Sequence, residues 1–484
     1  MKSIQKLIPW LCLALLLLSL AACAGTAEEA EVLQAVVTLK KNDTIALRSA
    51  KTTSSVFDQT GTARKGERVT VRGVEGDWAY VYAEEGEGYI MTRFLTWVRP
   101  GEETPAPTPS PTPAPTGTPV PLTTLPPSAY VNTRAAFPAE AGEAQKVLLS
   151  FIGDVTLGSN EADHKNARAI DACIDRYGYD YPFARVSFIL AQDDLTVANL
   201  EGTFHSDNTG LTPQTKKAYN FRASPDRVEC LKLASIEAVA LGNNHSGDYG
   251  EPGYAETIET LDANGIGCFG NTPYGAKGWI WTHGGARIGF VSCYVSHWVI
   301  NDGANIPEIN ATIEAVREAG VDVLIAYMHG GVEYDAKHDR NQERFAQYFI
   351  NRGADIVIGS HPHRLQGCQL IDGVPVFYSL GNFVFGGNFT YYNKRHNVTI
   401  RYTAILQCAL SFDSEHRYLG CRFNIIPCRL GEDAMNNQYQ PFPIAGEEAD
   451  ACIKEFQTDT NKFWRLEGMT EDIGALQAFI PARK

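Results

Sequence analysis

Residues 321–367 read VDVLIAYMHGGVEYDAKHDRNQERFAQYFINRGADIVIGSHPHRLQG. The apolar runs VLIAYM and IVIG predict two buried strands, and the segment DRNQERFAQYFINRG between them predicts a helix that ends near a glycine. Strands that alternate with helices are typical of an α/β domain whose sheet is covered on its faces. His361 and His363 stand either side of Pro362 directly after the second strand, an arrangement that packing alone does not require.

The same alternation continues from residue 129 onward. Strand-like runs end in polar residues, as in VLLSFIGD, LTVANLEG, EAVALGNNH, ARIGFVSCY and VPVFYSLGNF. The segments EPGYAETIETLDANG and EINATIEAVREAG predict further helices. Beyond Asn388, the runs NVTIRYTAILQCALSF and YLGCRFNIIPCRL predict a second sheet, and a helical tail is expected from about Glu447. We therefore assign residues 129–484 to one α/β domain.

The first residues, MKSIQKLIPWLCLALLLLSLAACAG, combine two lysines with an apolar run that is typical of a secretory signal. The end of this run resembles the bacterial lipobox, in which a cysteine becomes the lipidated first residue of the mature protein. The resemblance implies a signal peptide at 1–22 and lipidation of Cys23. The chain would then be extracytoplasmic, a lipoprotein anchored in the membrane at the cell envelope by acyl groups. A plain signal peptide and an uncleaved anchor are the alternatives.

A small all-β region and a linker precede the α/β domain. Residues 35–98 contain short alternating strands punctuated by glycines, and the pattern LRSA, GERVTVRGVEGDWAYVY and EGYIMTRFL resembles bacterial SH3-like barrels of cell-wall proteins. Such modules bind peptidoglycan peptides or neighbouring proteins, or act as spacers. Residues 99–128 are rich in Pro, Thr and Ala and predict an extended linker, because they have too little apolar surface to form a core.

Composition excludes some classes of function. A formal net charge of −14 argues against a nucleic-acid partner, since no excess of cations is present to neutralise a phosphate backbone. Nine cysteines remain beyond Cys12 and Cys23, and no CxxC pair occurs, so a thiolate zinc site is not expected. An odd number allows some disulfides and leaves at least one thiol free.

Carboxylate, amide and imidazole side chains collect at the predicted strand ends. They are Asp154, Asn199, Glu201, Asn243, Asn244, His245, His329, Glu333, His361 and His363. Taken singly, each has a bland explanation as a turn, a capping loop or a rigid corner. Ligands of α/β sheets bind at the carboxyl ends of strands, where loops can bring such residues together. The set therefore predicts a metal site with carboxylate and imidazole ligands.

Six motifs carry a family resemblance in this region: FIGDVTLG, ANLEGTF, LGNNHSGDYG, YMHGGVEY, IGSHPHRLQG and YSLGNF. Together they resemble the CapA domain of capsule and poly-γ-glutamate synthesis proteins, which is similar in turn to the calcineurin-like metallophosphoesterases. The resemblance implies a four-layer α/β/β/α sandwich that holds two divalent ions of the Mn, Fe or Zn type. Asp154, Glu201 and His363 would hold one ion, and Glu201 would bridge to a second ion held by Asn244, His329 and His361. His245 would correspond to the general acid of the phosphoesterases.

The chain departs from the phosphoesterase pattern at two positions. Thr156 stands where those enzymes have a histidine, and Glu201 replaces their bridging aspartate. The first site would therefore have one imidazole fewer than in those enzymes, which would leave it weaker, open to water or empty. Asn199, Asn243, Glu333 and Arg364 are candidates for contacting substrate or for orienting a ligand. Arg364, Lys216 and Lys217 could also meet an anionic polymer, although for the lysines a solvated surface is the favoured interpretation.

These observations lead to one functional hypothesis and two alternatives. The first is an exported, membrane-tethered, metal-dependent hydrolase or transferase acting on an anionic polymer such as poly-γ-glutamate or capsule, or on its attachment to the wall. The second is a non-catalytic polymer-binding or scaffold lipoprotein. The third is an exported phosphoesterase for small substrates. No GxxxxGK[ST] loop occurs, so the chain is not expected to power polymerisation itself.

Overall fold

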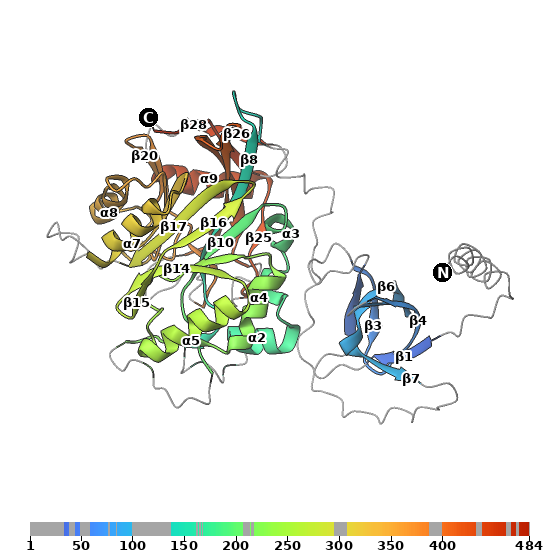
Figure 1. Ribbon diagram of the computed structural model, residues 1–484. Coiled ribbons are helices and arrows are strands. Elements are labelled where there is room, and N and C mark those ends of the chain that lie inside the picture. The colour runs from blue at the N-terminus through green and yellow to red at the C-terminus, as the bar shows by residue number, and fades with distance from the viewer. Residues whose placement is uncertain are drawn as a thin grey trace, which may run out of the picture. The chain divides into compact units, whose positions relative to one another are not determined.

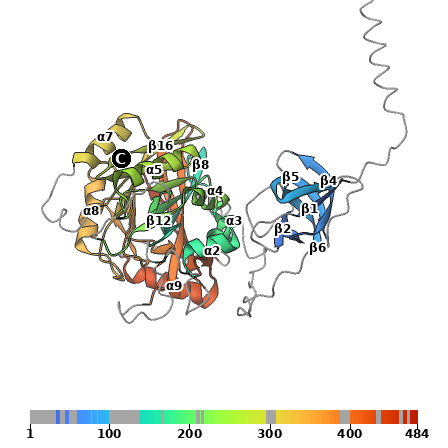
Figure 2. The ribbon, with the colours of Figure 1, turned by 90° about the horizontal axis from the view of Figure 1, so that it is seen from below.

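A computed structural model places the chain as two compact units, each of which is described by itself (Figures 1 and 2). It describes residues 33–37, 44–48, 59–75, 78–83, 85–98, 137–160, 163, 166, 168–206, 213, 217–294, 307–386, 399–431, 438–460, 466–470 and 474–483. The signal peptide, Cys23, the linker at 99–128 and Lys216 lie outside the described residues, so those assignments stay predictions. Among the described residues, no helix has the length and apolar character needed to cross a membrane.

The first unit is a seven-stranded antiparallel sheet in the order β2-β3-β6-β5-β4-β1-β7, in which β2 also pairs with β6. Alternate residues of its strands, including Val69, Val71, Ala79 and Val81, are buried in a small apolar core. The SH3-like identity of this unit stays a prediction. The strands are β1 (Leu33–Val37), β2 (Thr44–Arg48), β3 (Gln59–Arg64), β4 (Arg68–Glu75), β5 (Trp78–Ala83), β6 (Glu85–Met91) and β7 (Leu95–Val98).

The second unit is a mixed α/β fold around a curled sheet. In one half, β8 (Gln145–Val155), β10 (Leu195–Leu200) and β13 (Ala238–Ala240) are parallel. On the other side of β8, β23 (Tyr402–Phe412) and β24 (Tyr418–Arg429) continue the sheet antiparallel. The prediction that the C-terminal strands form a second sheet is therefore wrong, because β23 pairs with the first strand of the domain.

The other half of the curled sheet is mainly parallel. Its strands are β17 (Ala286–Tyr294), β18 (Val323–His329), β19 (Ile356–Ser360) and β21 (Val374–Phe377), with β16 (Trp279–His283) and β20 (Cys368–Ile371) antiparallel. β14 (Gly267–Thr272) joins the halves, since it pairs with β13 and, through Asn271, with β17.

The sequence of strand β18 is a continuous apolar run because the strand is buried on both faces. Val323, Ile325 and Tyr327 face the interior between the two halves of the sheet, together with Phe151 and Phe423. The alternate residues, such as Leu324 and Ala326, face the helices α7 (Pro307–Glu318) and α8 (Arg340–Ile350). Successive side chains of a strand point to opposite faces, so a strand that is buried on both faces has apolar residues at every position.

Helices cover both halves of the sheet. α2 (Ile170–Tyr177), α3 (Ser187–Leu190), α4 (Val228–Leu233) and α5 (Gly250–Ala263) pack on β8, β10 and β13, and α7 (Pro307–Glu318) and α8 (Arg340–Ile350) pack on β17, β18 and β19. α5, α7 and α8 confirm the predicted helices. α9 (Gly446–Thr458) confirms the start of the predicted helical tail, but strands follow it: β26 (Leu466–Thr470), β27 (Gly474–Gln477) and β28 (Ile480–Pro481).

Short elements complete the unit. The remaining strands are β9 (Ser159–Asn160), β11 (Thr203–Phe204), β12 (Phe221–Ala223), β15 (Gly275–Lys277), β22 (Asn382–Val384) and β25 (Phe442–Pro443). β9, β11 and β12 form a small separate sheet. β22 pairs with the end of β8, which places Asn382 beside Asp154.

Candidate metal centre

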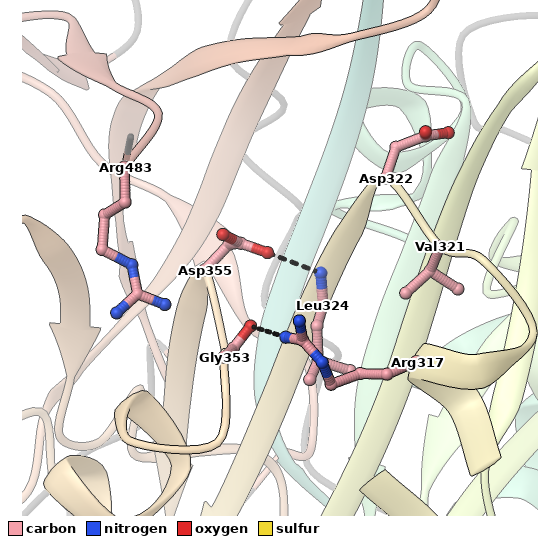
Figure 3. Close-up of a pocket in the computed structure, with 7 residues that line it drawn as sticks. All are labelled: Arg317, Val321, Asp322, Leu324, Gly353, Asp355 and Arg483. Atoms are coloured by element: carbon pink, nitrogen blue, oxygen red, sulfur yellow. Dashed lines mark hydrogen bonds between the residues drawn. The ribbon is translucent and has the colours of Figure 1, made fainter. Parts of the chain in front are cut away.

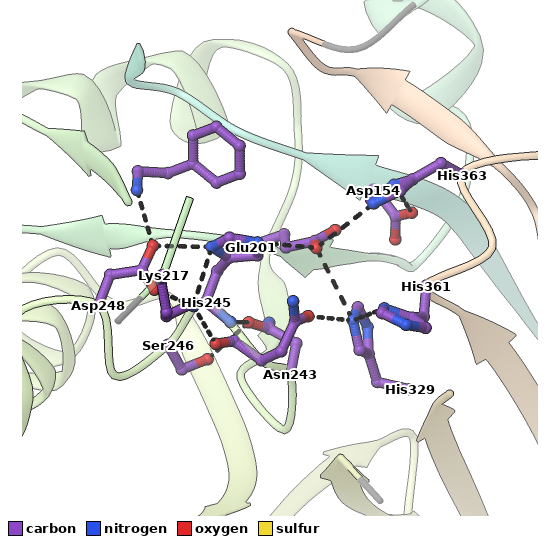
Figure 4. Close-up of polar contacts among 12 residues, drawn as sticks. Asp154, Glu201, Lys217, Asn243, His245, Ser246, Asp248, His329, His361 and His363 are labelled. Atoms are coloured by element: carbon purple, nitrogen blue, oxygen red, sulfur yellow. Dashed lines mark hydrogen bonds and ion pairs between the residues drawn. The ribbon is translucent and has the colours of Figure 1, made fainter. Parts of the chain in front are cut away.

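Five strand ends bring the predicted residues together at one edge of the curled sheet (Figure 4). Asp154 lies near the end of β8, Glu201 follows β10, Asn244 follows β13, His329 ends β18, and His361 follows β19. Close backbone packing positions them. A Cβ atom at Gly153 would lie 1.9 Å from the carbonyl oxygen of Gly381, and that same oxygen accepts a hydrogen bond from the Asp154 amide. Only glycine fits at position 153, and the close approach of the two backbones there holds the neighbouring Asp154 in place.

The first ligand group consists of Asp154, Glu201 and His363, all buried. Nδ1 of His363 lies 3.2 Å from Asp154 Oδ2 and 2.9 Å from Asn382 Oδ1, while Nε2 lies 3.9 Å from Glu201 Oε1. If Nδ1 carries the proton and donates to Asn382, Nε2 is left as the nitrogen with a free lone pair on the side of Glu201.

The second ligand group consists of Glu201, His329 and His361, also buried. Nε2 of His329 lies 2.7 Å from Asn244 Oδ1, 3.1 Å from His361 Nδ1 and 3.7 Å from Glu201 Oε1. Zinc-type ions bind such atoms at about 2.1 Å, which places neighbouring ligand atoms about 3–3.5 Å apart. The three separations from His329 Nε2 lie within a few tenths of an ångström of this range, and Glu201 belongs to both groups.

The carboxylate oxygens fit a cation because they are buried and three of them have no hydrogen bond. Asp154 Oδ2 and both oxygens of Glu201 are buried and accept no hydrogen bond. Buried polar atoms are almost always paired, and an unpaired buried charge is costly. Bound cations would satisfy all three oxygens, so the donor set fits divalent ions.

The protonation equilibria reflect the same crowding. Burial, together with the nearby charge of Asp154, raises the pKa of Glu201 well above its ordinary value. Burial, reinforced by the neighbouring His361, lowers the pKa of His329 well below its ordinary value. Burial also disfavours a charged His363, but Glu201 and Asp154 outweigh it and raise the pKa of His363 to about 9. Burial and mutual charge thus displace the pKa values of carboxylates and imidazoles in the cluster, as is common at functional sites.

The histidine loop has an unusual backbone. His361 and His363 adopt φ angles of 98° and 56°, in the left-handed region that side chains other than glycine seldom occupy. Their rings diverge, with 6.0 Å between centroids, so that His361 faces His329 and His363 faces Asp154. Such strain persists where the surrounding structure enforces it, and it is concentrated at functional sites.

His245 forms a hydrogen-bonded unit beside the ligand groups. Its Nδ1 lies 2.7 Å from Asp248 Oδ2, and its Nε2 lies 3.9 Å from Glu201 Oε1. Lys217 pairs with the other oxygen of Asp248 and donates to the Asn244 carbonyl at 2.6 Å. Burial lowers the pKa of His245, against the opposing effect of Asp248. The favoured interpretation of Lys217 as a solvated surface residue is therefore wrong.

The other predicted residues occupy distinct places. Asn199 is buried and donates to Asp154 Oδ1 at 2.9 Å, and Asn243 donates to the Leu200 carbonyl at 2.7 Å, so both hold the ligand loops together. Glu333 is exposed near the cluster and contributes its charge to Glu201 and His363. The guanidinium of Arg364 donates to Glu455 of α9 at 3.0 and 3.1 Å.

Thr156 does not replace the missing imidazole. It is buried, and its hydroxyl lies 3.5 Å from the Val384 carbonyl. Three residues that were not predicted from the sequence also lie at the centre: Asp248, Ser360 and Asn382. Asp248 follows His245 by three residues, and Asn382 lies within the motif YSLGNF, so each had a signal that went unused. Ser360 Oγ lies 2.9 Å from Nδ1 of His329.

A pocket of about 370 Å³ lies at the opposite ends of β18 and β19 (Figure 3). The polar side chains that line this pocket form hydrogen bonds with backbone groups. Arg317 donates to the Gly353 carbonyl, Arg483 donates to the Ala354 carbonyl, and Asp355 accepts from the Leu324 amide. Two guanidinium groups face two carboxylates there, so the charges balance, and we assign this pocket a structural role.

Residues 148–387 match the family model described as "Bacterial capsule synthesis protein PGA_cap". The chain therefore contains a PGA_cap domain, which confirms the CapA resemblance over these residues. It is 28% identical over 276 residues to the capsule biosynthesis protein CapA of Bacillus anthracis, a match that covers 54% of this chain and 64% of that protein. It is 25% identical over 334 residues to the PGA biosynthesis protein CapA of Bacillus subtilis strain 168, which covers 66% of this chain and 80% of that protein.

The match to the Bacillus anthracis relative is partial in length, and the likeness to a solved structure is low. The chain spans less than two thirds of the length of the Bacillus anthracis relative. Among solved structures, a putative 5′-nucleotidase from Staphylococcus aureus aligns with a TM-score of 0.32 at 14% identity, over 65% of this chain and 58% of that one. That likeness is too low to bear on fold or function, so the metallophosphoesterase relationship stays a prediction.

Proposed function

We propose that this protein is an exported, membrane-tethered, metal-dependent hydrolase or transferase that acts in the synthesis, export or wall attachment of an anionic polymer such as poly-γ-glutamate or capsule. The observation that carries the proposal is the pair of buried ligand groups that share Glu201 and contain three carboxylate oxygens without a hydrogen bond. The named functions of the CapA relatives supply the polymer. A four-layer metallophosphoesterase-like arrangement belongs to the same proposal.

Each residue has a role in this proposal. Asp154, Glu201 and His363 would hold one divalent ion, and Glu201, Asn244, His329 and His361 a second. Ions of the Mn, Fe or Zn type supply Lewis acidity toward the substrate and lower the pKa of a water molecule. His245 can exchange a proton with a leaving group through Nε2, because Asp248 holds Nδ1 and fixes the ring.

The proposed location and the other proposed partners rest on the sequence alone. Lipidation of Cys23 would tether the protein to the membrane, the Pro-rich linker would hold the catalytic domain away from it, and the SH3-like region would meet peptidoglycan. Thr156 favours a second candidate, a non-catalytic polymer-binding or scaffold lipoprotein, because its hydroxyl faces the Val384 carbonyl and His363 is left as the one imidazole of the first group.

Metal content tests the proposal. Elemental mass spectrometry of the purified protein should find about two equivalents of Mn, Fe or Zn. The variant His361→Ala should lose about one of them, because it removes a ligand from the second group alone. His283→Ala is the matched control, since this histidine ends β16 outside both ligand groups and should leave the content unchanged. Absence of metal after reconstitution with each ion would overturn the proposal, and about one equivalent in the unaltered protein would favour a mononuclear site.

A further inference from the structure

The ammonium group of Lys217 lies against the turn at 243–248, which connects β13 to α5 (Figure 4). Its Nζ donates to the Asn244 carbonyl at 2.6 Å, pairs with Asp248 Oδ1 and lies 3.3 Å from Nδ1 of His245. The Lys217 side chain is 24% exposed. In the surface pair of Lys232 with Glu229 both side chains are 40% exposed, and such pairs contribute little to stability. Lys217 therefore has the contacts of a residue that belongs to the site.

Asp248 holds this ammonium group in place. Its carboxylate is fully buried, and Oδ2 accepts a hydrogen bond from the Phe221 amide and lies 2.7 Å from Nδ1 of His245. A buried carboxylate is costly unless an opposite charge pairs with it, and Lys217 supplies that charge at Oδ1. Lys217 and Phe221 both lie in the segment 217–221 that leads into β12, so this segment is tied to the turn at two points.

Asn244 is the proposed ligand whose position depends on this contact. Its Oδ1 lies 2.7 Å from Nε2 of His329 in the second ligand group. An amide oxygen carries no net charge, so it attracts a cation less strongly than the carboxylate of Glu201 does. Asn244 is also only partly buried, whereas Glu201 and His329 are buried. The amide oxygen therefore needs support from its own backbone to stay at the site.

Side chains from two other segments fix that backbone. Asn243 donates to the Leu200 carbonyl at 2.7 Å, and its Oδ1 accepts from the His245 amide at 3.0 Å. The Asn244 carbonyl, between these two positions, accepts from Lys217. Because a peptide unit is planar, a fixed carbonyl oxygen also fixes the Cα atoms on either side. The contact with Lys217 thus narrows the directions open to the Asn244 side chain.

We propose that Lys217 is a positioning residue for the second metal ion. Through the Asn244 carbonyl it holds the Asn244 amide oxygen where that oxygen can bind the ion. Lys217 itself binds no metal, since an ammonium group has no lone pair. This inference rests on the proposed function and deepens it, because occupancy of the second group then depends on a side chain that lies outside both ligand groups.

Charge and position predict opposite effects when Lys217 is replaced, and this makes the role testable. Lys217→Met keeps most of the side-chain length but leaves the Asp248 carboxylate without its counter-charge. By charge alone, the unpaired carboxylate would attract a cation and tighten metal binding. Loss of the contact with Asn244 would instead weaken the second ion. We expect position to prevail, because Asp248 keeps its hydrogen bonds with Phe221 and His245.

Stepwise titration of the full-length protein with Mn²⁺, followed by calorimetry, measures the effect. The step that His361→Ala removes identifies the second group. Lys217→Met should weaken this step by about tenfold or more and leave the first step within about twofold of its original affinity. Lys217→Arg keeps the charge and the N–H donors, so it should bind the second ion at least about threefold more tightly than Lys217→Met. Lys217→Gln takes the place of Lys217→Met if thermal unfolding shows that the latter is not folded.

Two controls separate positioning from a general loosening of the fold. Asn160→Ala removes the acceptor of the Asn220 amide, at 2.9 Å, and so loosens the same segment without changing Lys217. Lys232→Met removes a lysine from the surface pair on α4. Both variants should bind both ions like the unaltered protein. An unchanged or tighter second step in Lys217→Met, no recovery in Lys217→Arg, or equal weakening in Asn160→Ala would overturn the inference.

The same titrations separate this inference from the proposed function. Two bound ions with a second step that does not depend on Lys217 would overturn the inference and leave the metal centre standing. A second step that depends on Lys217, in a protein that cleaves neither poly-γ-glutamate nor 4-nitrophenyl phosphate, would support the inference and favour a binding role over catalysis. Absence of metal from the unaltered protein after reconstitution would overturn both.

Discussion

At the scale of single residues, partners outside the two ligand groups determine which atoms face the candidate ions. Asn382 Oδ1 lies 2.9 Å from Nδ1 of His363, and Ser360 Oγ lies 2.9 Å from Nδ1 of His329. In both rings Nδ1 is engaged and Nε2 turns toward Glu201. A hydrogen bond on the nitrogen away from the metal fixes the tautomer and the ring orientation, so residues that bind no metal still tune its affinity.

Asn382→Ala is therefore expected to weaken metal binding by about 10- to 100-fold at the first group and to leave the second group near its original affinity. Titration with Mn²⁺ followed by calorimetry would resolve the two steps. Asn351→Ala, which removes an exposed amide at the end of α8, serves as the control. Equal weakening of both steps would contradict a role confined to His363.

At the scale of elements, local sequence signals explain where helices begin and why strands lie so close together. Asp339 precedes α8 and accepts hydrogen bonds from the amides of Asn341 and Gln342, while the Gln342 side chain accepts from the Asp339 amide. This capping box satisfies amides that the first turn would otherwise leave unpaired. Because α8 packs on β18 and β19, its position also supports the strands that carry the histidines.

Asp339→Ala should lower the free energy of unfolding by about 1 kcal/mol, since it removes the acceptor for two helix amides. Asp339→Ser keeps an acceptor and should lower the free energy of unfolding by only a few tenths of that amount. Urea denaturation followed by circular dichroism measures both variants. A loss of equal size in the two would show that the carboxylate charge, and not the cap, stabilises the helix.

Gly153→Ala should be far more damaging than an ordinary glycine substitution. Its methyl group would lie 1.9 Å from the Gly381 carbonyl oxygen, and backbone atoms cannot move aside without separating β8 from the segment that precedes β22. We expect loss of metal binding together with a lower midpoint of thermal unfolding. Gly265→Ala is a useful contrast, because no atom lies within 4 Å of the added carbon and only its φ of 72° opposes the change.

At the scale of the whole α/β unit, the C-terminal helix supports the histidine loop. Arg364 pairs with Glu455, and Asp459 accepts hydrogen bonds from the Gly367 amide and from His338. His338 stacks on Tyr378, with 3.8 Å between ring centroids. Residues about 90 positions beyond the loop in sequence thus hold it in place.

This support is expected to depend on pH. Burial opposes the charged form of His338, but the hydrogen bond to Asp459, its charge and that of Glu343 outweigh this effect and raise the pKa of His338 above 6.5. A raised pKa in the folded state stabilises the protein fully below the unfolded value near 6.5, and the stabilisation disappears as the pH rises through the folded value. The loss of thermal stability in Asp459→Asn should therefore be larger at about pH 5.5 than at about pH 9. An equal loss at both pH values would show that Asp459 stabilises the fold only through its hydrogen bonds with backbone amides.

Much of the α/β unit and its candidate site could be predicted because the signals are local. Period-two and helical patterns predicted α5, α7 and α8 and the strands between them, and residues at strand ends pointed to the ligand groups. Pairing between distant strands was not predictable in the same way. β23 could have started a new sheet or extended the old one, and its own residues are apolar in either case.

The amino-acid sequence by itself determined which side chains this protein could offer to a metal ion, because carboxylates and imidazoles at strand ends are visible as letters. Only the tertiary structure decided how they combine. It placed Glu201 in both ligand groups and left Tyr219 and Tyr294 exposed beside the cluster. It also paired Lys217 with Asp248 and Arg364 with Glu455. The physical reason is that burial, ion pairing and ligand geometry depend on distances between residues far apart in the chain, and those distances are set by packing of the whole fold.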